Sequence, residues 1–113
     1  MILPNRGEVW TTNLDPTLGH EQAGHRPCLI VSANKLNHSR AELVVVVPIT
    51  TKDKRIPSHV KVPQGEGGLS EDSFIKCEEV RCISTQRLDR PLGKLNPQTI
   101  RQVEEWIRVI LGL

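Results

Sequence analysis

A polar loop that leads into an apolar run contains the side chains best suited to chemistry. Residues 19–27 read Gly-His-Glu-Gln-Ala-Gly-His-Arg-Pro, and the apolar run Cys-Leu-Ile-Val follows directly. Arg26 lies where the loop enters this run, which would hold the residue firmly while its guanidinium faces the loop. A planar guanidinium can grip a phosphate with two hydrogen bonds, so the position suits anion binding. Arg26 could alternatively form an ordinary surface ion pair with Glu21 or Asp15.

Thr50 and Thr51 form a second polar segment, which follows four consecutive valines and a Pro-Ile dipeptide. If the valine run and the apolar run after Arg26 pair as neighbouring strands, Arg26 and Thr50 come close together at one end of the sheet. Thr50 could alternatively be a plain residue at a strand end.

Conventional catalytic and metal-binding patterns are absent from the sequence. There is no Cys-x-x-Cys pair, and the four histidines lack the spacing of zinc ligands, so we expect no metal ion and no cofactor. Residues 65–68 are rich in glycine but lack the lysine and the following helix of a phosphate-binding loop. No Gly-x-Ser-x-Gly motif occurs. Cys28 lies inside an apolar run, where we expect a core residue rather than a nucleophile.

The composition indicates one domain over residues 1–113. A net charge of +2 is too weak to indicate a nucleic-acid binder by itself. The N-terminal residues have no basic start followed by a long apolar run, and no apolar stretch approaches the roughly 20 residues needed to cross a bilayer. Together with three cysteines, an odd number, this favours reduced thiols and a cytoplasmic protein without a membrane partner.

Short β-rich runs alternate with connections rich in glycine and proline. The expected strands are residues 7–14, 27–32, 43–50, 59–62, 73–83 and 88–95, of which 73–83 is interrupted by two glutamates at 78 and 79. Pro48 has no backbone N–H, so we expect an interrupted ladder there. Residues 15–25 and 51–57 are expected to be polar loops, and loops as long as the first are often functional.

The last segment has the pattern of a helix. Asn96 suits the N-cap, Pro97 the first helical position and Gly112 the end. Apolar side chains recur at helical spacing at Ile100, Val103, Ile107 and Ile110. Trp106 and Val109 lie outside this stripe and could either widen the core face or form part of a dimer contact. Short strands with one C-terminal helix predict a mainly β fold, a small curled sheet or barrel packed on that helix.

The order of short motifs closely resembles the MazF/PemK family of toxin endoribonucleases. The motifs are Arg-Gly-Glu-Val-Trp at 6–10, Leu-Asp-Pro-Thr at 14–17, Glu-Gln-x-Gly-x-Arg-Pro at 21–27, Val-Pro-Ile-Thr at 47–50, Gly-Gly-Leu at 67–69, Asp-Ser at 72–73, Glu-Val-Arg at 79–81, Arg-Leu at 87–88 and Leu-Gly at 92–93. Because they run in order over nearly the whole chain, the resemblance is specific.

The resemblance implies an SH3-like β-barrel of the CcdB/PemK type with a C-terminal helix, working as a homodimer. It implies metal-independent cleavage of single-stranded RNA at short sequences, which leaves a 2′,3′-cyclic phosphate and a 5′-hydroxyl and inhibits translation and growth. It also implies an antitoxin partner whose acidic, largely disordered tail covers the RNA groove. The family's catalytic arginine and threonine match Arg26 and Thr50.

Cleavage by the RNA's own 2′-hydroxyl needs three things. A base must take the proton of that hydroxyl, the charge on the phosphate must be stabilised, and a proton must be returned to the leaving oxygen. Arg26 suits the phosphate charge but is a poor proton carrier, because arginine is effectively always protonated. Glu21 is a candidate base, and Gln22 and Thr50 are candidate donors. His20 could assist acid–base work, although a solvated loop position is the favoured interpretation.

Further RNA contacts are expected from basic and polar residues near these loops. The candidates are His20, Gln22, Thr51, Lys52, Lys54, Arg55 and Arg81. The basic residues could alternatively be a solvated face, and Arg81 a surface cation. With only three aromatic residues and no tyrosine, stacking cannot be the main means of holding RNA.

Two other functions remain open from the residues. A toxin on the same barrel could inhibit DNA gyrase by contact alone, as CcdB-like proteins do, through the end of the C-terminal helix and without Arg26 or Thr50. The chain could also be an interaction barrel that is not toxic. Metal-free cutting of RNA would separate these from an enzyme.

Overall fold

The structure is a computed structural model that describes residues 2–113. Two helices and seven strands form the fold, with three single 3₁₀ turns between them. The strands are β1 (Glu8–Asn13), β2 (His25–Ile30), β3 (Leu43–Thr50), β4 (His59–Val62), β5 (Ser73–Lys76), β6 (Arg81–Ser84) and β7 (Leu88–Lys94). The helices are α1 (Asn34–Asn37) and α2 (Pro97–Leu111), and the 3₁₀ turns are η1 (Glu66–Gly68), η2 (Cys77–Glu79) and η3 (Thr85–Arg87).

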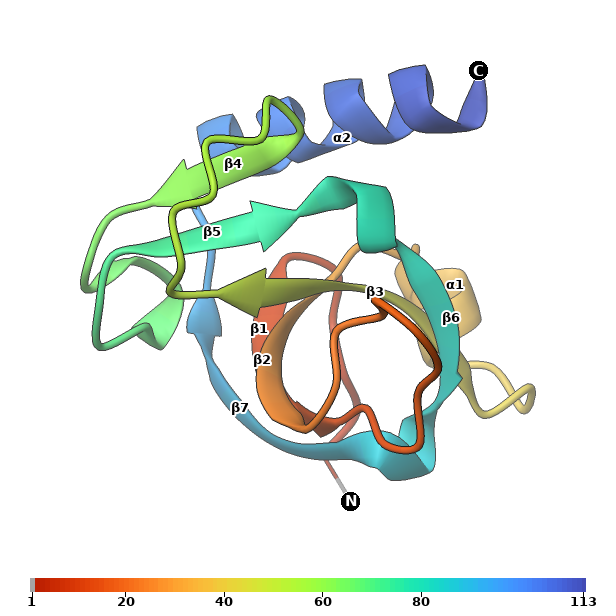
Figure 1. Cartoon of the computed structure of the whole chain (residues 1–113). Coiled ribbons are helices and arrows are strands. Elements are labelled where there is room, and N and C mark those ends of the chain that lie inside the picture. The colour runs from red at the N-terminus through yellow and green to blue at the C-terminus, as the bar shows by residue number, and fades with distance from the viewer. Residues whose placement is uncertain (1) are drawn as a thin grey trace.

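All strand pairs are antiparallel, and the sheet order is β4-β5-β3-β2-β1-β7, with β6 also paired to β3. Figure 1 shows the sheet curled strongly, with α2 lying across the side formed by β4 and β5. The predicted mainly β fold with one C-terminal helix is confirmed. Within residues 2–113, no helix has the length and apolar character that crossing a membrane would require.

The central strand β3 changes its partner at Pro48. One edge of β3 pairs with β2, while the other pairs with β6 through residues 43–46 and with β5 through residues 49–50. Pro48 lies between these two stretches, where the missing N–H costs no ladder bond. The predicted interruption is confirmed, and its cause is η2, which separates β5 from β6. Residues 73–83 are therefore two strands rather than the single interrupted strand expected from the sequence.

Apolar side chains on both faces of β2 and β3 are buried, as their continuous apolar runs predict. One cluster lies on the side of α2 and includes Leu29, Val47, Ile49 and Val103. The second includes Trp10, Cys28, Val44 and Val46 from the opposite face of the same strands. Because side chains alternate along a strand, each of these strands contributes to both clusters.

The helix α2 begins and ends where the sequence predicts, but its first turn is held differently. The Asn96 side chain makes no capping hydrogen bond. Instead Glu66 Oε2 accepts hydrogen bonds from the Asn96 backbone N–H at 3.1 Å and the Thr99 hydroxyl at 2.7 Å. A carboxylate at this place also interacts favourably with the positive end of the helix dipole. Gly112 ends the helix in the left-handed conformation, with φ 71°.

The apolar stripe of α2 is buried only over part of its length. Val103 is fully buried, and Ile100, Trp106 and Ile107 pack partly buried against the helix-side cluster. Trp106 thus widens the core face. Ile110 and Val109 are exposed, by 37% and 69% respectively, so the stripe extends past the sheet that α2 covers.

The short helix α1 is an element that the sequence analysis did not assign. Asn37 is buried there and donates a hydrogen bond from Nδ2 to the Ser32 carbonyl oxygen at 2.9 Å. The Ser32 hydroxyl in turn accepts from the Val45 backbone N–H at 2.9 Å. These polar contacts, rather than an apolar pattern, fix the connection between β2 and β3.

Candidate functional site

A cavity of about 230 Å³ opens at the C-terminal end of β3, between the loop before β2 and the loop after β3. We call it the Arg26 cavity. Its lining residues come from both loops, β2, β3 and β5, and they are Gly19, His20, Glu21, Gln22, Arg26, Thr50, Lys52, Lys54 and Lys76.

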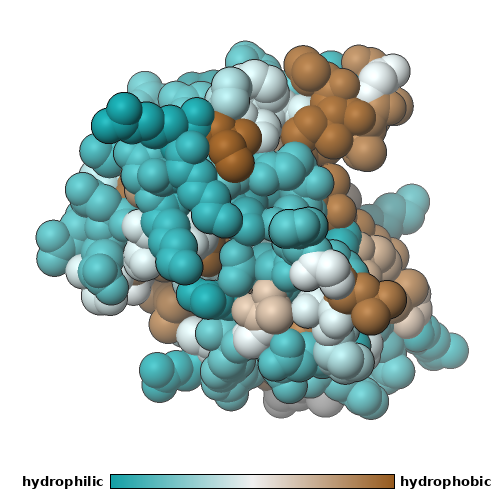
Figure 2. Space-filling view, in the orientation of Figure 1, coloured by the Kyte–Doolittle hydropathy of each residue, from teal (hydrophilic) through white to brown (hydrophobic). Residues whose placement is uncertain are grey.

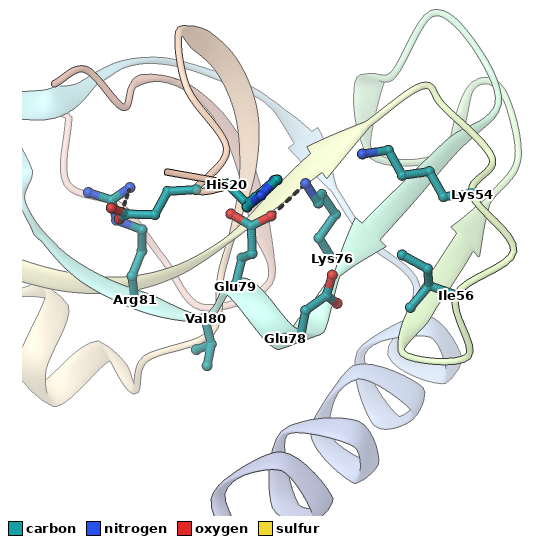
Figure 3. A pocket seen from close by; sticks show the side chains of 9 residues that line it. His20, Lys54, Ile56, Lys76, Glu78, Glu79, Val80 and Arg81 are labelled. Carbon is teal, nitrogen blue, oxygen red and sulfur yellow. Dashed lines mark ion pairs between the residues drawn. The ribbon is translucent and has the colours of Figure 1, made fainter. Parts of the chain in front are cut away.

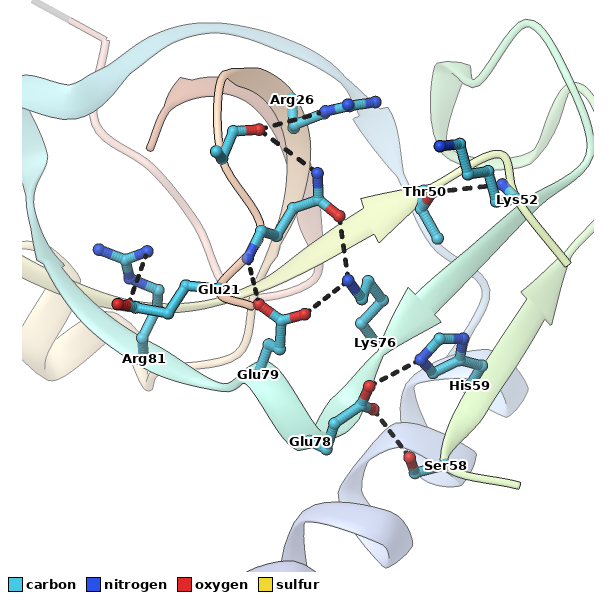
Figure 4. A network of polar contacts seen from close by, with 12 residues as sticks. Glu21, Arg26, Thr50, Lys52, Ser58, His59, Lys76, Glu78, Glu79 and Arg81 are labelled. Carbon is cyan, nitrogen blue, oxygen red and sulfur yellow. Dashed lines mark hydrogen bonds and ion pairs between the residues drawn. The ribbon is translucent and has the colours of Figure 1, made fainter. Parts of the chain in front are cut away.

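Arg26 and Thr50 meet at this cavity because of the β2–β3 register. The strands are antiparallel with Cys28 opposite Pro48, so Arg26, two residues before Cys28, lies at the same end of the sheet as Thr50, two residues after Pro48. Thr50 is only 5% exposed, and its Oγ1 accepts a hydrogen bond from the Lys52 backbone N–H at 3.2 Å. Its hydroxyl proton thus remains available to donate into the cavity. Figure 4 shows the two residues from neighbouring strands beside the same opening.

Arg26 does not form the surface ion pair that was its alternative interpretation. Its Nε donates to the Ala23 carbonyl oxygen at 3.3 Å, and no carboxylate of residues 2–113 lies within ion-pair distance of its guanidinium. Asp15 accepts from the Gly24 backbone N–H at 3.0 Å, and Glu21 lies 3.9 Å from Arg81 Nη1. The terminal nitrogens of Arg26 are therefore left for a ligand.

The charge of the Arg26 cavity is strongly one-sided. Arg26, Lys52, Lys54 and Lys76 line it, and the only carboxylate among the lining residues is that of Glu21. Lys76 is ion-paired with Glu79, so the positive charge of the cavity comes from the other three cations. Clustered charges of one sign in a concave surface concentrate ligands of the opposite sign. The cavity thus suits an anionic group such as a phosphate, although the net charge of the whole chain is only +2.

A buried ion pair forms the floor between the loop and β5. Lys76, whose side chain is 7% exposed, lies with Nζ 2.5 Å from Glu79 Oε2 and donates to Gln22 Oε1 at 3.0 Å. Glu79 Oε1 accepts from the Gln22 backbone N–H at 2.5 Å. Gln22 is therefore held by its side chain and by its backbone, as Figure 4 shows.

A second cavity, of about 480 Å³, adjoins the first. Four residues line both cavities: His20, Glu21, Lys54 and Lys76. The second cavity adds the apolar side chains of Ile56 and Val80 and the charged ones of Glu78, Glu79 and Arg81. Figure 3 shows the side chains that line it, which come from η2, β5, β6 and the two loops. The two cavities together make an extended surface along one side of the sheet end, mainly polar in the Arg26 cavity and mixed polar and apolar in the second.

Glu78 is held in its ionised form at the edge of the second cavity. It accepts hydrogen bonds from Ser58 Oγ at 2.7 Å and pairs with His59 Nε2 at 2.7 Å. Burial raises the pKa of Glu78, but the hydrogen bonds from Ser58 and His59 outweigh it, and the pKa lies below its ordinary value.

The structure places most of the predicted site residues together, but not all. Eight of the ten line one or both cavities: His20, Glu21, Gln22, Arg26, Thr50, Lys52, Lys54 and Arg81. Thr51 and Arg55 are exposed and line neither cavity. The Arg55 backbone has φ 54°, and its N–H donates to Asp53 Oδ1 at 3.0 Å. Their expected contacts with RNA find no support in this placement.

Lys76 and Glu79 are site residues that the sequence analysis missed. Lys76 follows an apolar strand segment and precedes Glu79 by three residues, a spacing at which opposite charges meet on one turn. That spacing was the only local signal. Their contacts with Gln22 bridge 54 and 57 residues of sequence and are visible only in the fold.

The cysteines give no nucleophile to either cavity. Burial raises the pKa of both the Cys28 and the Cys77 thiol to about 12. Both belong to the apolar clusters, which confirms the prediction for Cys28. Among residues 2–113, no three His, Cys, Asp or Glu side chains gather as ligands for a metal ion would.

Comparison with known proteins gives consistent results over nearly the whole chain. Residues 5–111 match the family model described as a PemK-like, MazF-like toxin of type II toxin–antitoxin systems. The chain is 33% identical to endoribonuclease MazF9 of Mycobacterium tuberculosis, over 96% of each protein. It is 30% identical to endoribonuclease EndoA of Bacillus subtilis, over 99% of this chain and 97% of that protein.

Solved structures show the same fold. A MazF crystal structure from Deinococcus radiodurans aligns over all of both chains with a TM-score of 0.89 and 24% identity. A mycobacterial endoribonuclease in complex with its cognate antitoxin aligns over 100% of this chain and 97% of that one, with a TM-score of 0.78 and 26% identity.

Proposed function

The chain belongs to the PemK-like, MazF-like toxin family of type II toxin–antitoxin systems, and on that premise we propose that it is a toxin endoribonuclease. It cuts single-stranded RNA at short sequences without a metal ion, and it leaves a 2′,3′-cyclic phosphate and a 5′-hydroxyl. Loss of intact messenger RNA then inhibits translation and growth. The observation that carries the proposal is the Arg26 cavity, where an arginine without a carboxylate partner shares a cationic pocket with the Thr50 hydroxyl.

The cavity supplies the groups that this reaction needs. The RNA 2′-oxygen loses its proton and attacks the adjacent phosphorus, the bond from phosphorus to the 5′-oxygen breaks, and that oxygen takes up a proton. Negative charge grows on the non-bridging oxygens, where the free guanidinium nitrogens of Arg26 stabilise it through two parallel hydrogen bonds. The Thr50 hydroxyl donates a further hydrogen bond to the same phosphate.

Glu21 is the proposed base for the 2′-hydroxyl proton. It lines both cavities, its side chain is 50% exposed, and its Oε1 is oriented by the Leu18 backbone N–H at 2.9 Å. A carboxylate that is oriented and still accessible can take a proton from a bound substrate. His20 lines both cavities as well and contacts the RNA strand in this proposal.

Binding relies on phosphate contacts and base edges. Lys52 and Lys54 meet the phosphates that flank the cut, while Gln22 and Arg81 lie where polar groups can reach bases or sugars. Within residues 2–113 no Phe, Trp or Tyr side chain lines either cavity, so base stacking there rests on the His20 imidazole alone. Affinity should therefore fall steeply with salt, because phosphate contacts release counterions.

The gyrase-binding alternative is not retained. It would place the functional contacts at the end of α2, and the Arg26 cavity would then have no function. The curated relatives named above are endoribonucleases, and the features of the cavity match that activity rather than a contact inhibitor.

A second copy of the chain and an antitoxin are the proposed protein partners, in the cytoplasm. The cationic cavity suits an acidic, partly disordered antitoxin tail, which would exclude RNA by occupying the same pocket. Apolar residues at the end of α2 remain exposed, including Val109 at 69% and Leu111 at 54%. Figure 2 shows a hydrophobic area at the upper right, where Figure 1 places the C-terminal end of α2. We propose that this area contributes to a homodimer interface.

Incubation of the purified chain with a long single-stranded RNA in excess EDTA tests the proposed activity. Mapping of new 5′ ends should show discrete cuts, and the products should carry 5′-hydroxyl groups. A matched oligonucleotide with one 2′-deoxy sugar at the cut should remain intact, because it lacks the attacking oxygen. Cutting that requires added metal, or that proceeds at the 2′-deoxy site, contradicts the proposal.

A further inference from the structure

Fold stability is a weak explanation for the buried ion pair between Lys76 and Glu79. The Lys76 and Glu79 side chains are 7% and 18% exposed, and their charged atoms lie 2.5 Å apart. Removing two charges from water carries a large free-energy penalty, and their mutual attraction often fails to offset it, so a well-packed neutral pair can be as stable. The pair therefore calls for an explanation other than fold stability.

The ion pair holds one residue of the loop that leads to Arg26. Glu79 binds the backbone N–H of Gln22, and Lys76 binds its side-chain oxygen. An ammonium group can only donate hydrogen bonds, so the Gln22 oxygen must face Lys76 and its amide nitrogen must point away. That nitrogen donates to the Ala23 carbonyl oxygen at 3.3 Å.

The Ala23 carbonyl oxygen also accepts a hydrogen bond from Arg26. Arg26 Nε donates to the Ala23 oxygen at 3.3 Å, so Gln22 and Arg26 share one acceptor. Polar contacts thus run without a gap from Glu79 through Lys76, Gln22 and Ala23 to Arg26 (Figure 4). With Nε engaged, the terminal nitrogens of the guanidinium have no hydrogen-bond partner within residues 2–113 and remain free for a phosphate.

We propose that Lys76 and Glu79 are positioning residues that fix the guanidinium of Arg26 through Gln22 and the Ala23 carbonyl. This inference rests on the proposed nuclease function for its consequence in catalysis. A misplacement of about 1 Å can cost about 100-fold in rate, so a rigid loop at this point raises the rate of cutting. The ion pair acts on the chemical step, through Arg26, and not on the affinity for RNA.

The kinetic test compares Lys76→Met with native chain in two backgrounds. In the native background, Lys76→Met should lower kcat by about 10- to 100-fold while KM changes by less than about twofold. In an Arg26→Ala background, whose residual rate is measured under single-turnover conditions, Lys76→Met should have little further effect, because its route to the substrate has been removed. An equal loss in both backgrounds, or a loss confined to KM, would mean that Lys76 contacts the RNA directly and overturns the inference.

The double variant Lys76→Met/Glu79→Gln separates positioning from stability. It leaves no unpaired buried charge, so its midpoint of urea unfolding should stay close to that of the native chain. Its kcat should nevertheless stay low, because the ammonium that donates to Gln22 Oε1 is lost and methionine offers no donor in its place. A double variant that regains the native kcat contradicts the inference, because the two charges would then serve only to neutralise each other.

A measurement on the free protein keeps this inference separable from the nuclease proposal. The Arg26 Nε–H should exchange slowly with solvent in ¹⁵N NMR spectra of the native chain and about tenfold faster in Lys76→Met. Lys35→Met is the matched control, since Lys35 is exposed on α1, and it should leave this exchange rate unchanged. If the native chain cuts no RNA, the proposed function fails while the exchange rates still test the positioning. If the native chain cuts RNA and Lys76→Met changes neither exchange nor kcat, the positioning fails alone.

Discussion

Gly68 lies so close to β7 that there is no room for a Cβ atom. A Cβ built on Gly68 would lie 2.1 Å from the Leu92 carbonyl oxygen and 2.6 Å from its carbon, both of which are backbone atoms. Gly68 also has φ +74°, in the left-handed region that a residue with a side chain adopts at a cost of about 1–2 kcal/mol. Gly68→Ala therefore combines backbone strain with a clash that no side-chain rotation can relieve.

The magnitude follows from these two contributions. Overpacking against rigid neighbours typically costs about 1–3 kcal/mol, so the full loss in the free energy of unfolding should be about 2–5 kcal/mol. For a domain near 100 residues, each kcal/mol lowers the melting temperature by about 4 °C or more, so Gly68→Ala should lower it by about 8–20 °C. The loss should also loosen the start of α2, because η1 contributes the Glu66 carboxylate that binds there.

Gly65→Ala is the control that isolates the clash. Gly65 has φ +96°, but a Cβ there meets no atom within 4 Å, so only the strain of about 1–2 kcal/mol applies. Thermal unfolding followed by circular dichroism, with urea titrations for the free energy, should show a clearly larger loss for Gly68→Ala. Equal losses for the two variants would refute the close packing of η1 on β7.

Three further predictions concern other parts of the chain. The exposed Cys82 should react quickly with a disulfide reagent at about pH 8. Cys28 and Cys77 should react only on unfolding, because burial raises the pKa of both thiols to about 12. Fast reaction of all three thiols would contradict the burial of Cys28 and Cys77. Despite burial, the hydrogen bonds from Ser58 and His59 hold the pKa of Glu78 below its ordinary value of 4.5. The contribution of Glu78 to stability is therefore complete above pH 4.5 and is lost as the pH falls through the lowered pKa. Glu78→Gln should therefore flatten the acid limb of a plot of unfolding free energy against pH, and an unchanged limb would exclude Glu78 as a contributor. Glu66→Gln should cost about 1 kcal/mol in urea unfolding, because it weakens the charge at the start of α2; native-like stability would show that this carboxylate does not hold the helix.

Strand positions were predictable where local sequence and tertiary contacts agree. The valine run between polar loops gives β3 its observed bounds, and β4 also begins and ends as expected. The strands after β4 were harder to predict, because Glu78 and Glu79 indicate that a strand is interrupted but not that the chain changes direction there. The turn η2 moves the chain from one part of β3 to another, so that β5 pairs with residues 49–50 and β6 with residues 43–46. No local sequence pattern indicates this change of pairing.

Residues that act through distant partners could not be predicted from type and spacing. Asn96 is a favourable N-cap residue, yet Glu66 from an earlier turn reaches the helix start and replaces its side chain in that role. In the site, the proximity of Arg26 and Thr50 was predictable, because Arg26 lies at the start of β2, Thr50 ends β3, and the two strands pair antiparallel. Lys76 was not, since its only partner near in sequence is Glu79 and its contact with Gln22 requires the folded loop.

The most direct test of the central claim is the single-turnover rate of RNA cutting in EDTA by the native chain, Arg26→Ala, Thr50→Val and Lys35→Met. Arg26→Ala and Thr50→Val should retain the native circular dichroism spectrum and lose about 100-fold or more in rate, because each removes a group that stabilises charge on the phosphate. Lys35→Met should cut at the native rate. Full rates in both Arg26→Ala and Thr50→Val would contradict the account.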